Sequence, residues 1–261
     1  MSKYISSLQN PTVKRLLQLQ EKSRTRKKEG GFIIEGKREI ELAIAGGYTI
    51  TEVYYDEQLI APSSVEELVG TKISLTSLAT EVYKKVAYRA GTEGVIAFAK
   101  AKKTTLSELQ LPVNPLILVA EAPEKPGNIG ALLRTADAAA VDAVIIANPK
   151  TDLYNPNIIR SSVGCVFTTQ IATGSTEEVI SFLQEKDVAI YSAILQEAVD
   201  YATQAYTGGS AIVVGTEATG LSPEWRTVGT NIKIPMRGKI DSMNVSVAAG
   251  ILIFEARRQR S

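Results

Sequence analysis

The chain has 261 residues, of which 44% are hydrophobic and 22% are charged, with a net charge of +1, a composition typical of a folded globular protein. It has no histidine and one cysteine, which excludes imidazole-based catalysis, a disulfide within the chain and a zinc site built from thiolates. No apolar run approaches the ~20 residues of a membrane-spanning helix and the N-terminus lacks the apolar centre of a signal peptide, so we expect a cytoplasmic protein that binds neither membrane nor metal.

In the first 103 residues, short apolar runs alternate with amphipathic stretches. Val13, Leu16 and Leu17 repeat with helical spacing, whereas runs rich in β-branched and aromatic residues indicate buried strands. Helices are expected over residues 12–21, 38–45, 65–69 and 78–86, and strands over residues 32–34, 52–55, 73–75 and 94–99. The pattern predicts a small α/β or α+β domain.

Residues 31–38 (GFIIEGKR) come close to the spacing of a phosphate-binding Walker A loop. Arg38 stands where that motif needs Ser or Thr, and apolar residues fill the part that should be an open loop. A strand, a turn at Gly36 and a helix beginning near Lys37 account for the same residues without a nucleotide.

Charge is divided unevenly along the chain. Residues 1–103 carry 17 basic and 12 acidic side chains, a net +5, whereas residues 104–261 carry 12 basic and 16 acidic ones, a net −4. Five of the seven residues 22–28 are basic, which indicates either a solvated face or flexible loop, or a track for a phosphate backbone. The candidate side chains for phosphate binding are Lys22, Arg24, Arg26, Lys27, Lys28, Lys37 and Arg38.

Residues 104–115 are polar, lack periodicity and contain two prolines, which predicts a linker. Beyond them, strand-length apolar runs are separated by helical patterns. Strands are expected over residues 116–120, 143–147, 188–194, 211–215 and 232–234. Strands that alternate with helices predict a parallel sheet covered on both faces.

Three segments of the second half place glycines and small polar residues next to apolar runs: residues 128–138 (NIGALLRTADA), 213–221 (VVGTEATGL) and 234–250 (IPMRGKIDSMNVSVAAG). Loops at the carboxyl edge of a parallel sheet build ligand sites, so a small-molecule site assembled from the three is predicted. Asn128 is expected to cap the helix of the first segment. Asp241 or Ser242 is expected to cap a final helix that runs to about Gln259.

Together the three segments resemble the SpoU or TrmH family of ribose 2′-O-methyltransferases, within the SPOUT superfamily. The matching residues are Asn128, Gly130, Arg134, Thr135, Ala136, Gly215, Glu217, Gly220, Leu221, Ser222, Ile234, Pro235, Met236, Ser242, Asn244, Val245, Ser246, Val247 and Ala248. The resemblance covers roughly residues 116–256, and residues 32–44 (FIIEGKREIELAI) are similar to a ribosomal-protein-L30-like substrate-binding domain. Two departures are Ala140, where the family usually has glycine, and Met243, where leucine is usual.

The resemblance implies an N-terminal RNA substrate-binding domain at residues 1–103 and, after the linker, a SPOUT α/β domain at residues 116–261 with a mostly parallel sheet and a trefoil knot. It also implies S-adenosylmethionine as the cofactor and a homodimer with sites at the interface. Cofactor contacts fall on Gly215, Ile234 and Met243. The family's substrate-side polar residues correspond to Asn128, Arg134, Glu217, Ser242 and Asn244.

Methyl transfer from a sulfonium needs a positioned hydroxyl and a destination for its proton, and it needs no histidine. Arg134 corresponds to the family's proposed base, but a free guanidinium is essentially always protonated. Two roles are therefore open: an arginine deprotonated through its neighbours, or a cation that stabilises developing alkoxide charge. We favour the second, because an oriented donor is worth ~3 kcal/mol whereas neutralising arginine costs more.

Ribosomal RNA is the predicted substrate, because the N-terminal domain resembles the one in ribosomal members. The alternatives are a transfer RNA ribose methyltransferase, a catalytically silent RNA-binding relative, and a nucleotide- or NAD-dependent α/β enzyme. The presence of Asn128, Arg134, Glu217 and Asn244 argues against a silent relative. The absence of GxGxxG and Walker motifs argues against the nucleotide-dependent enzyme.

Overall fold

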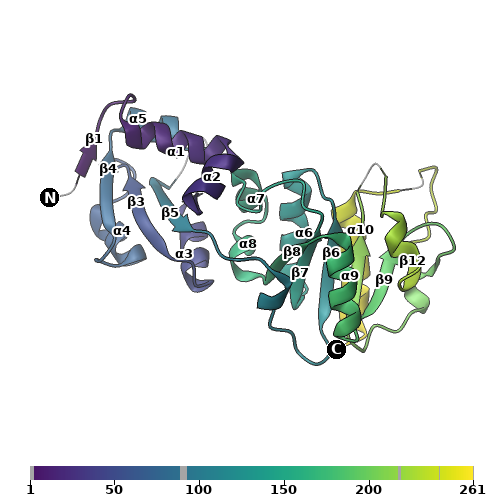
Figure 1. Cartoon of the computed structure of the whole chain (residues 1–261). Coiled ribbons are helices and arrows are strands. Elements are labelled where there is room, and N and C mark those ends of the chain that lie inside the picture. The colour runs from purple at the N-terminus through teal and green to yellow at the C-terminus, as the bar shows by residue number, and fades with distance from the viewer. Residues whose placement is uncertain (1–2, 89–92, 217–218, 241, 261) are drawn as a thin grey trace. The chain divides into compact units, whose positions relative to one another are not determined.

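The computed structural model describes residues 3–88, 93–216, 219–240 and 242–260, which form two compact units (Figure 1). One unit comprises Met1–Lys102 together with Asp152–Thr168, and the other comprises Lys103–Thr151 together with Thr169–Ser261. The chain therefore passes from one unit to the other three times.

The first unit is built on a five-stranded sheet in the order β1-β4-β3-β5-β2. Its strands are β1 (Lys3–Ile5), β2 (Gly31–Glu35), β3 (Ile50–Tyr55), β4 (Ser74–Leu78) and β5 (Val95–Lys100). β1, β4 and β3 are parallel, and β5 is antiparallel to both β3 and β2. Its helices include α1 (Pro11–Glu21), α2 (Ser23–Glu29), α3 (Lys37–Ala45), α4 (Pro62–Val69) and α5 (Thr80–Val86). This mixed sheet with helices confirms the expected fold class of the N-terminal half.

Local sequence signals account for most of these elements. Pro11 at the first position of α1 and the side chain of Asn10, which accepts from the Thr12 N–H at 2.8 Å, begin that helix. Gly36, with φ at +104°, turns β2 into α3, so the strand, turn and helix expected in place of a Walker loop are confirmed. The basic run forms a helix, α2, that ends at Gly30. β1 and the second half of β4 are strands that the sequence pattern does not predict.

The segment Asp152–Thr168 belongs to the first unit although residues 116–261 are predicted to form one domain. It contains α7 (Pro156–Ser161) and α8 (Cys165–Thr168). The Tyr154 ring stacks on Phe32 with centroids 4.0 Å apart, and Phe167 stacks on Phe32 at 5.9 Å. Tyr48 packs edge-on against both Tyr154 and Phe167. Burial raises the pKa of the Tyr48 and Tyr154 phenols, so both keep their protons at neutral pH inside this aromatic cluster.

The second unit contains a seven-stranded sheet in the order β10-β12-β9-β11-β6-β7-β8, and every strand pair in it is parallel. The strands are β6 (Leu116–Glu121), β7 (Ala143–Ala147), β8 (Ile171–Gly174), β9 (Ala189–Ala193), β10 (Val199–Asp200), β11 (Ser210–Val214) and β12 (Thr230–Lys233). All five expected strands are present within two residues of their expected bounds. β8 and β10 are additional.

Helices cover both faces of this sheet, as the alternation of strands and helices predicts. Ile117 and Val119 of β6 pack with Val179 and Leu183 of α9 (Thr176–Glu185) on one face. α6 (Pro126–Ala138) and α10 (Val245–Arg258) pack against each other, and α10 contacts β6 and β11. Figure 1 shows α9 on the near side of the sheet and α10 on the far side. The α/β fold with a mostly parallel sheet is confirmed, while the trefoil knot stays a prediction.

The expected linker is an ordered part of the second unit. It contains the short 3-10 helix η1 (Leu106–Glu108), and Leu106, Leu109 and Leu111 pack against the same core as α9. The Thr104 carbonyl accepts from the Thr173 N–H of β8 at 2.6 Å, which adds residues 104–111 to the edge of the sheet. Across the described ranges, no helix is long and apolar enough to cross a membrane.

Candidate active site

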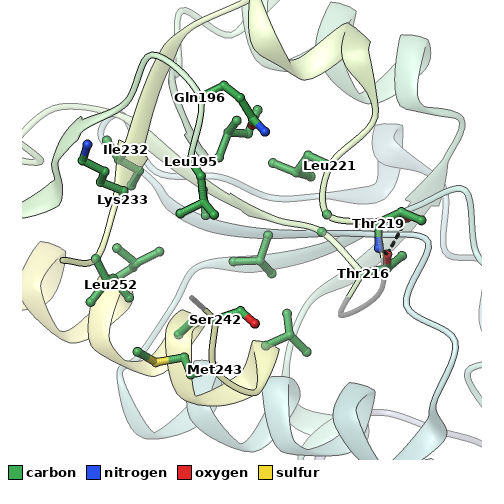
Figure 2. Close-up of a pocket in the computed structure, with 18 of the residues that line it drawn as sticks. Leu195, Gln196, Thr216, Thr219, Leu221, Ile232, Lys233, Ser242, Met243 and Leu252 are labelled. Atoms are coloured by element: carbon green, nitrogen blue, oxygen red, sulfur yellow. Dashed lines mark hydrogen bonds between the residues drawn. The ribbon is translucent and has the colours of Figure 1, made fainter. Parts of the chain in front are cut away.

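A cavity of about 360 Å³ lies at the carboxyl ends of three neighbouring strands of the second unit (Figure 2). Ala193, Val214 and Lys233 are the last residues of β9, β11 and β12, and all three line it. Ligands of parallel sheets bind at this edge because the loops that leave the strands diverge there. The cavity is therefore where the sequence pattern predicts a site.

The walls of the cavity are mainly apolar. Ile194, Leu221 and Leu252 are buried side chains that line it. Hydroxyl groups of Thr216 and Thr219 lie at one side, 2.8 Å apart, and the Thr219 N–H donates to Thr216 Oγ1 at 3.0 Å (Figure 2). Apolar walls with a few placed polar groups are typical of a site for a small organic ligand.

The first and third motifs meet beside this cavity. Asn244 is the N-cap of α10, where its Oδ1 accepts from the Ser246 N–H at 2.9 Å, and its Nδ2 donates to Asn128 Oδ1 at 3.3 Å. The expectation that Asp241 or Ser242 caps this helix is wrong for Ser242, while Asp241 lies outside the described residues. Asn128 is not a cap either, because Pro126 starts α6 two residues earlier and Lys125 is its N-cap. Asn128 instead lies in the first turn, within reach of Asn244.

The predicted cofactor residues Gly215, Ile234 and Met243 all line the cavity, as does Ser242. Figure 2 shows Ser242 and Met243 at the start of the segment that leads into α10. Arg134 is exposed on α6 and is not among the residues that line the cavity. Glu217 lies outside the described residues. The structure thus brings the second and third motifs together at the cavity and joins Asn128 of the first to them through Asn244.

Comparison with known families identifies the chain. The model of the SpoU rRNA Methylase family matches residues 115–254, more than half of the sequence. The chain belongs to the SpoU family. A second model, the MRM3-like substrate binding domain, matches residues 10–97. The resemblance to SpoU methyltransferases with an N-terminal substrate-binding domain is therefore confirmed, and the protein is a methyltransferase by its family.

Individual relatives cover nearly all of this SpoU chain. A 23S rRNA guanosine 2′-O-methyltransferase of Bacillus subtilis is 28% identical, covering 98% of this chain and 99% of its own. A 23S rRNA guanosine 2′-O-methyltransferase of Vibrio vulnificus is 33% identical, over 78% of this chain and 85% of its own. The crystal structure of an AdoMet-bound rRNA methyltransferase from Sinorhizobium meliloti superimposes with a TM-score of 0.90 at 28% identity, covering 98% of both chains.

The basic residues of the first unit of this SpoU protein fall into two kinds. Six of the seven candidates for phosphate binding are exposed: Lys22, Arg24, Lys27, Lys28, Lys37 and Arg38. Arg26 is the exception, since its side chain is only 5% exposed. Its guanidinium pairs with Asp152 at 2.5 Å and donates to the carbonyl groups of Leu19 and Gln20 at 2.6 and 2.9 Å. Its donors are therefore used inside the protein, and we leave Arg26 out of the RNA-binding set.

Three charged residues near the site were not predicted as functional from the sequence. Arg226 and Lys233 line the cavity and are exposed. Glu121, at the end of β6, is buried and accepts hydrogen bonds from Ser222 of the second motif. The position of each just before or after a strand end was the available signal. Within the described part of the chain, no group of three His, Cys, Asp or Glu side chains is placed to hold a metal ion.

Gly215 is required by a close backbone approach, and Gly215→Ala tests this. A Cβ atom on Gly215 would lie 2.2 Å from the carbonyl carbon of Gly220 and 2.4 Å from the Leu221 nitrogen. The loop must shift, so we expect S-adenosylmethionine binding to be lost by titration calorimetry and stability to fall by about 1–3 kcal/mol. The matched control is Gly127→Ala, where the new methyl group meets no atom within 4 Å. Equal cofactor affinity in the two variants would contradict the close approach.

Proposed function

We propose that this protein transfers the methyl group of S-adenosylmethionine to a ribose 2′-hydroxyl of ribosomal RNA. The observation that carries the proposal is the cavity at the carboxyl ends of β9, β11 and β12, lined by both the second and third motifs in a chain of the SpoU family. The named relatives act on 23S rRNA, and one superimposable relative holds AdoMet.

The cavity residues fit this cofactor in size and chemistry. A volume of about 360 Å³ lies within the usual range of small-molecule sites. Gly215, Ile234 and Met243 would hold it, with main-chain groups facing the adenine between apolar walls such as Leu221 and Leu252. When bound, the cofactor supplies a strongly electrophilic methyl group.

The polar residues of the site would position the ribose hydroxyl and manage its charge. Asn128 and Asn244 hold one another at 3.3 Å, which fixes two amide groups beside Ser242 at the cavity edge. Arg134 remains protonated at neutral pH and stabilises the developing alkoxide as an oriented donor. Glu217 is assigned to the same polar set from the sequence motif alone.

RNA binding is assigned to the N-terminal domain, predicted as residues 1–103, and methyl transfer to residues 116–261. The exposed cations on α2 and at the start of α3 supply a sequence-independent attraction for the phosphate backbone. Arg226 and Lys233 would extend this attraction to the cavity itself. Ribosomal RNA is favoured over transfer RNA because the curated relatives named above act on 23S rRNA.

A homodimer is part of the proposal. On α10, Ala249, Leu252, Ile253 and Ala256 face the interior, whereas Val247 is 53% and Phe254 is 50% exposed on the other side of the helix. An apolar stripe of this kind fits a second copy of the chain. Sedimentation equilibrium is expected to give twice the chain mass of 28.1 kDa, and a Phe254→Glu variant is expected to sediment as a monomer. A wild-type protein that stays monomeric at micromolar concentration would remove this part of the proposal. A cytoplasmic location stays a prediction.

Calorimetry and methyl incorporation together test the function. The protein is expected to bind S-adenosylmethionine and S-adenosylhomocysteine but not NAD, and to incorporate labelled methyl groups into ribosomal RNA at a ribose 2′-oxygen. Cofactor binding without incorporation into ribosomal or transfer RNA would favour the silent relative. Binding of NAD alone would favour a different α/β enzyme.

Charge reversal on α2 tests the RNA-binding surface. Lys27→Glu with Lys28→Glu is expected to raise the RNA Kd and to lower the salt dependence by about 0.7 per lost phosphate contact on a single strand. Measurement of log Kd against log salt concentration gives this slope. Lys72→Glu, also exposed in the first unit, is the matched control. The assignment fails if the control weakens RNA binding as much as the α2 variants do.

A further inference from the structure

Glu121 is a buried carboxylate with every strong contact directed to two other segments. It is the last residue of β6 and is 3% exposed. One oxygen accepts from the Ser222 N–H at 2.7 Å, and the other accepts from the Ser222 hydroxyl at 2.7 Å and the Thr176 hydroxyl at 2.6 Å. Since a buried charge is costly unless it is hydrogen-bonded, these donors are what allow a carboxylate at this position.

Ser222 is the end of the loop that forms one side of the cavity. The loop leaves β11 at Gly215 and returns at Gly220, which exchanges two backbone hydrogen bonds of 3.1 Å with Thr216. Leu221, the next residue, lines the cavity, and Ser222 follows it directly. The loop is therefore tied to β11 at its start and to β6, through Glu121, at its end.

We propose that Glu121 is a positioning residue that shapes the cofactor cavity through Ser222. The inference rests on the proposed function, because it concerns the site assigned to S-adenosylmethionine. Glu121 is not among the residues that line the cavity, so its effect reaches the ligand only through the loop. Without the carboxylate, the Ser222 N–H and hydroxyl lose their acceptor, and Leu221 and Gly220 lose the anchor that sets their distance from Gly215.

The single tryptophan of the chain gives a local readout of this loop that does not depend on activity. Trp225 is fully buried in the short 3-10 helix η3 (Pro223–Arg226), and its N–H donates to the Ser222 carbonyl at 3.2 Å. Its own carbonyl accepts from the Ser192 hydroxyl at 3.2 Å. A loosened Ser222 should therefore raise the quenching of Trp225 fluorescence by acrylamide.

The test compares Glu121→Ala with Thr176→Val by titration calorimetry with S-adenosylhomocysteine and by Trp225 quenching. Glu121→Ala is expected to raise the Kd about tenfold or more, since hydrogen bonds to a charged group are lost. It should also raise quenching and leave the RNA Kd unchanged. Thr176→Val removes one bond to the same carboxylate but none to the loop, and should keep the Kd within about twofold. In the Glu121→Ala background, Ser222→Ala should add little.

A folded Glu121→Ala protein with the wild-type Kd and wild-type quenching would overturn the proposal, as would an equal rise of Kd in Thr176→Val. If Glu121→Ala does not fold, Glu121→Gln replaces it. Its amide donor takes the place of one carboxylate oxygen, so a smaller rise in Kd and in quenching is expected, and wild-type values for both would overturn the proposal. If the wild-type protein binds no S-adenosylhomocysteine, the proposed function fails, while the quenching comparison still decides whether Glu121 holds the loop.

Discussion

Replacing Arg134 by lysine is expected to reduce the rate of methyl transfer about 10²–10³-fold, the usual cost of losing one oriented donor to a developing negative charge. Lysine keeps the positive charge but not the planar fork of donors, so a loss in this variant separates geometry from charge. The side chain is exposed on α6, outside the cavity lining, and cofactor affinity should not change.

Single-turnover kinetics with saturating RNA and S-adenosylmethionine measures this effect on the chemical step. The matched control is Arg258→Lys, another exposed arginine of the second unit, which pairs with Glu255 at 2.7 Å. Its rate should stay close to that of the wild type. If Arg134→Lys methylates RNA at the normal rate, Arg134 is not the group that stabilises the alkoxide.

Replacing Arg26 by methionine is expected to destabilise the first unit by about 3–5 kcal/mol, because removal of one partner leaves a buried charge uncompensated. Asp152 is left without its 2.5 Å partner, and the carbonyl groups of Leu19 and Gln20 lose their donor. Urea unfolding followed by circular dichroism measures the loss. Lys27→Met, next to it on α2 but exposed, should change stability by no more than about 0.5 kcal/mol and should instead weaken RNA binding.

An Asp152→Asn variant checks that the pair itself is responsible. It should cost a similar amount, and the double variant should cost less than the sum of the two single ones, because both remove the same interaction. Equal stabilities of Arg26→Met and Lys27→Met would show that Arg26 is not an internal anchor.

Strong local patterns in the sequence were sufficient to predict the main sheet. β7 lies where the apolar run predicts it, and Gly36 marks the turn from β2 to α3. β8 and β10 were missed because each is short and half polar, so their strand state depends on a neighbouring strand. The helix cap at Asn244 was missed because Asp241 and Ser242, only two or three residues earlier, carry side chains that cap equally well.

The site shows the same division. The three motifs predicted which loops line the cavity, because glycines and small polar residues at strand ends are a local signal. Glu121 carried no such signal, since its partner Ser222 is 101 residues away in the chain. Arg26 looked like its neighbours in a basic run, and only the fold shows that Asp152 receives it. Pairings between distant residues are set by tertiary structure, which is why sequence patterns alone do not predict them.

The first 102 residues are not a self-sufficient fragment. Cut at the polar stretch that follows them, this piece would keep Phe32 and Tyr48 but lose Tyr154 and Phe167, and Arg26 would face no carboxylate. Anyone who wishes to study RNA recognition in isolation should instead graft residues 152–168 onto it through a flexible tether. The same discontinuity constrains evolution, because exchanging the N-terminal domain between relatives also requires exchanging a matched insertion from the middle of the gene.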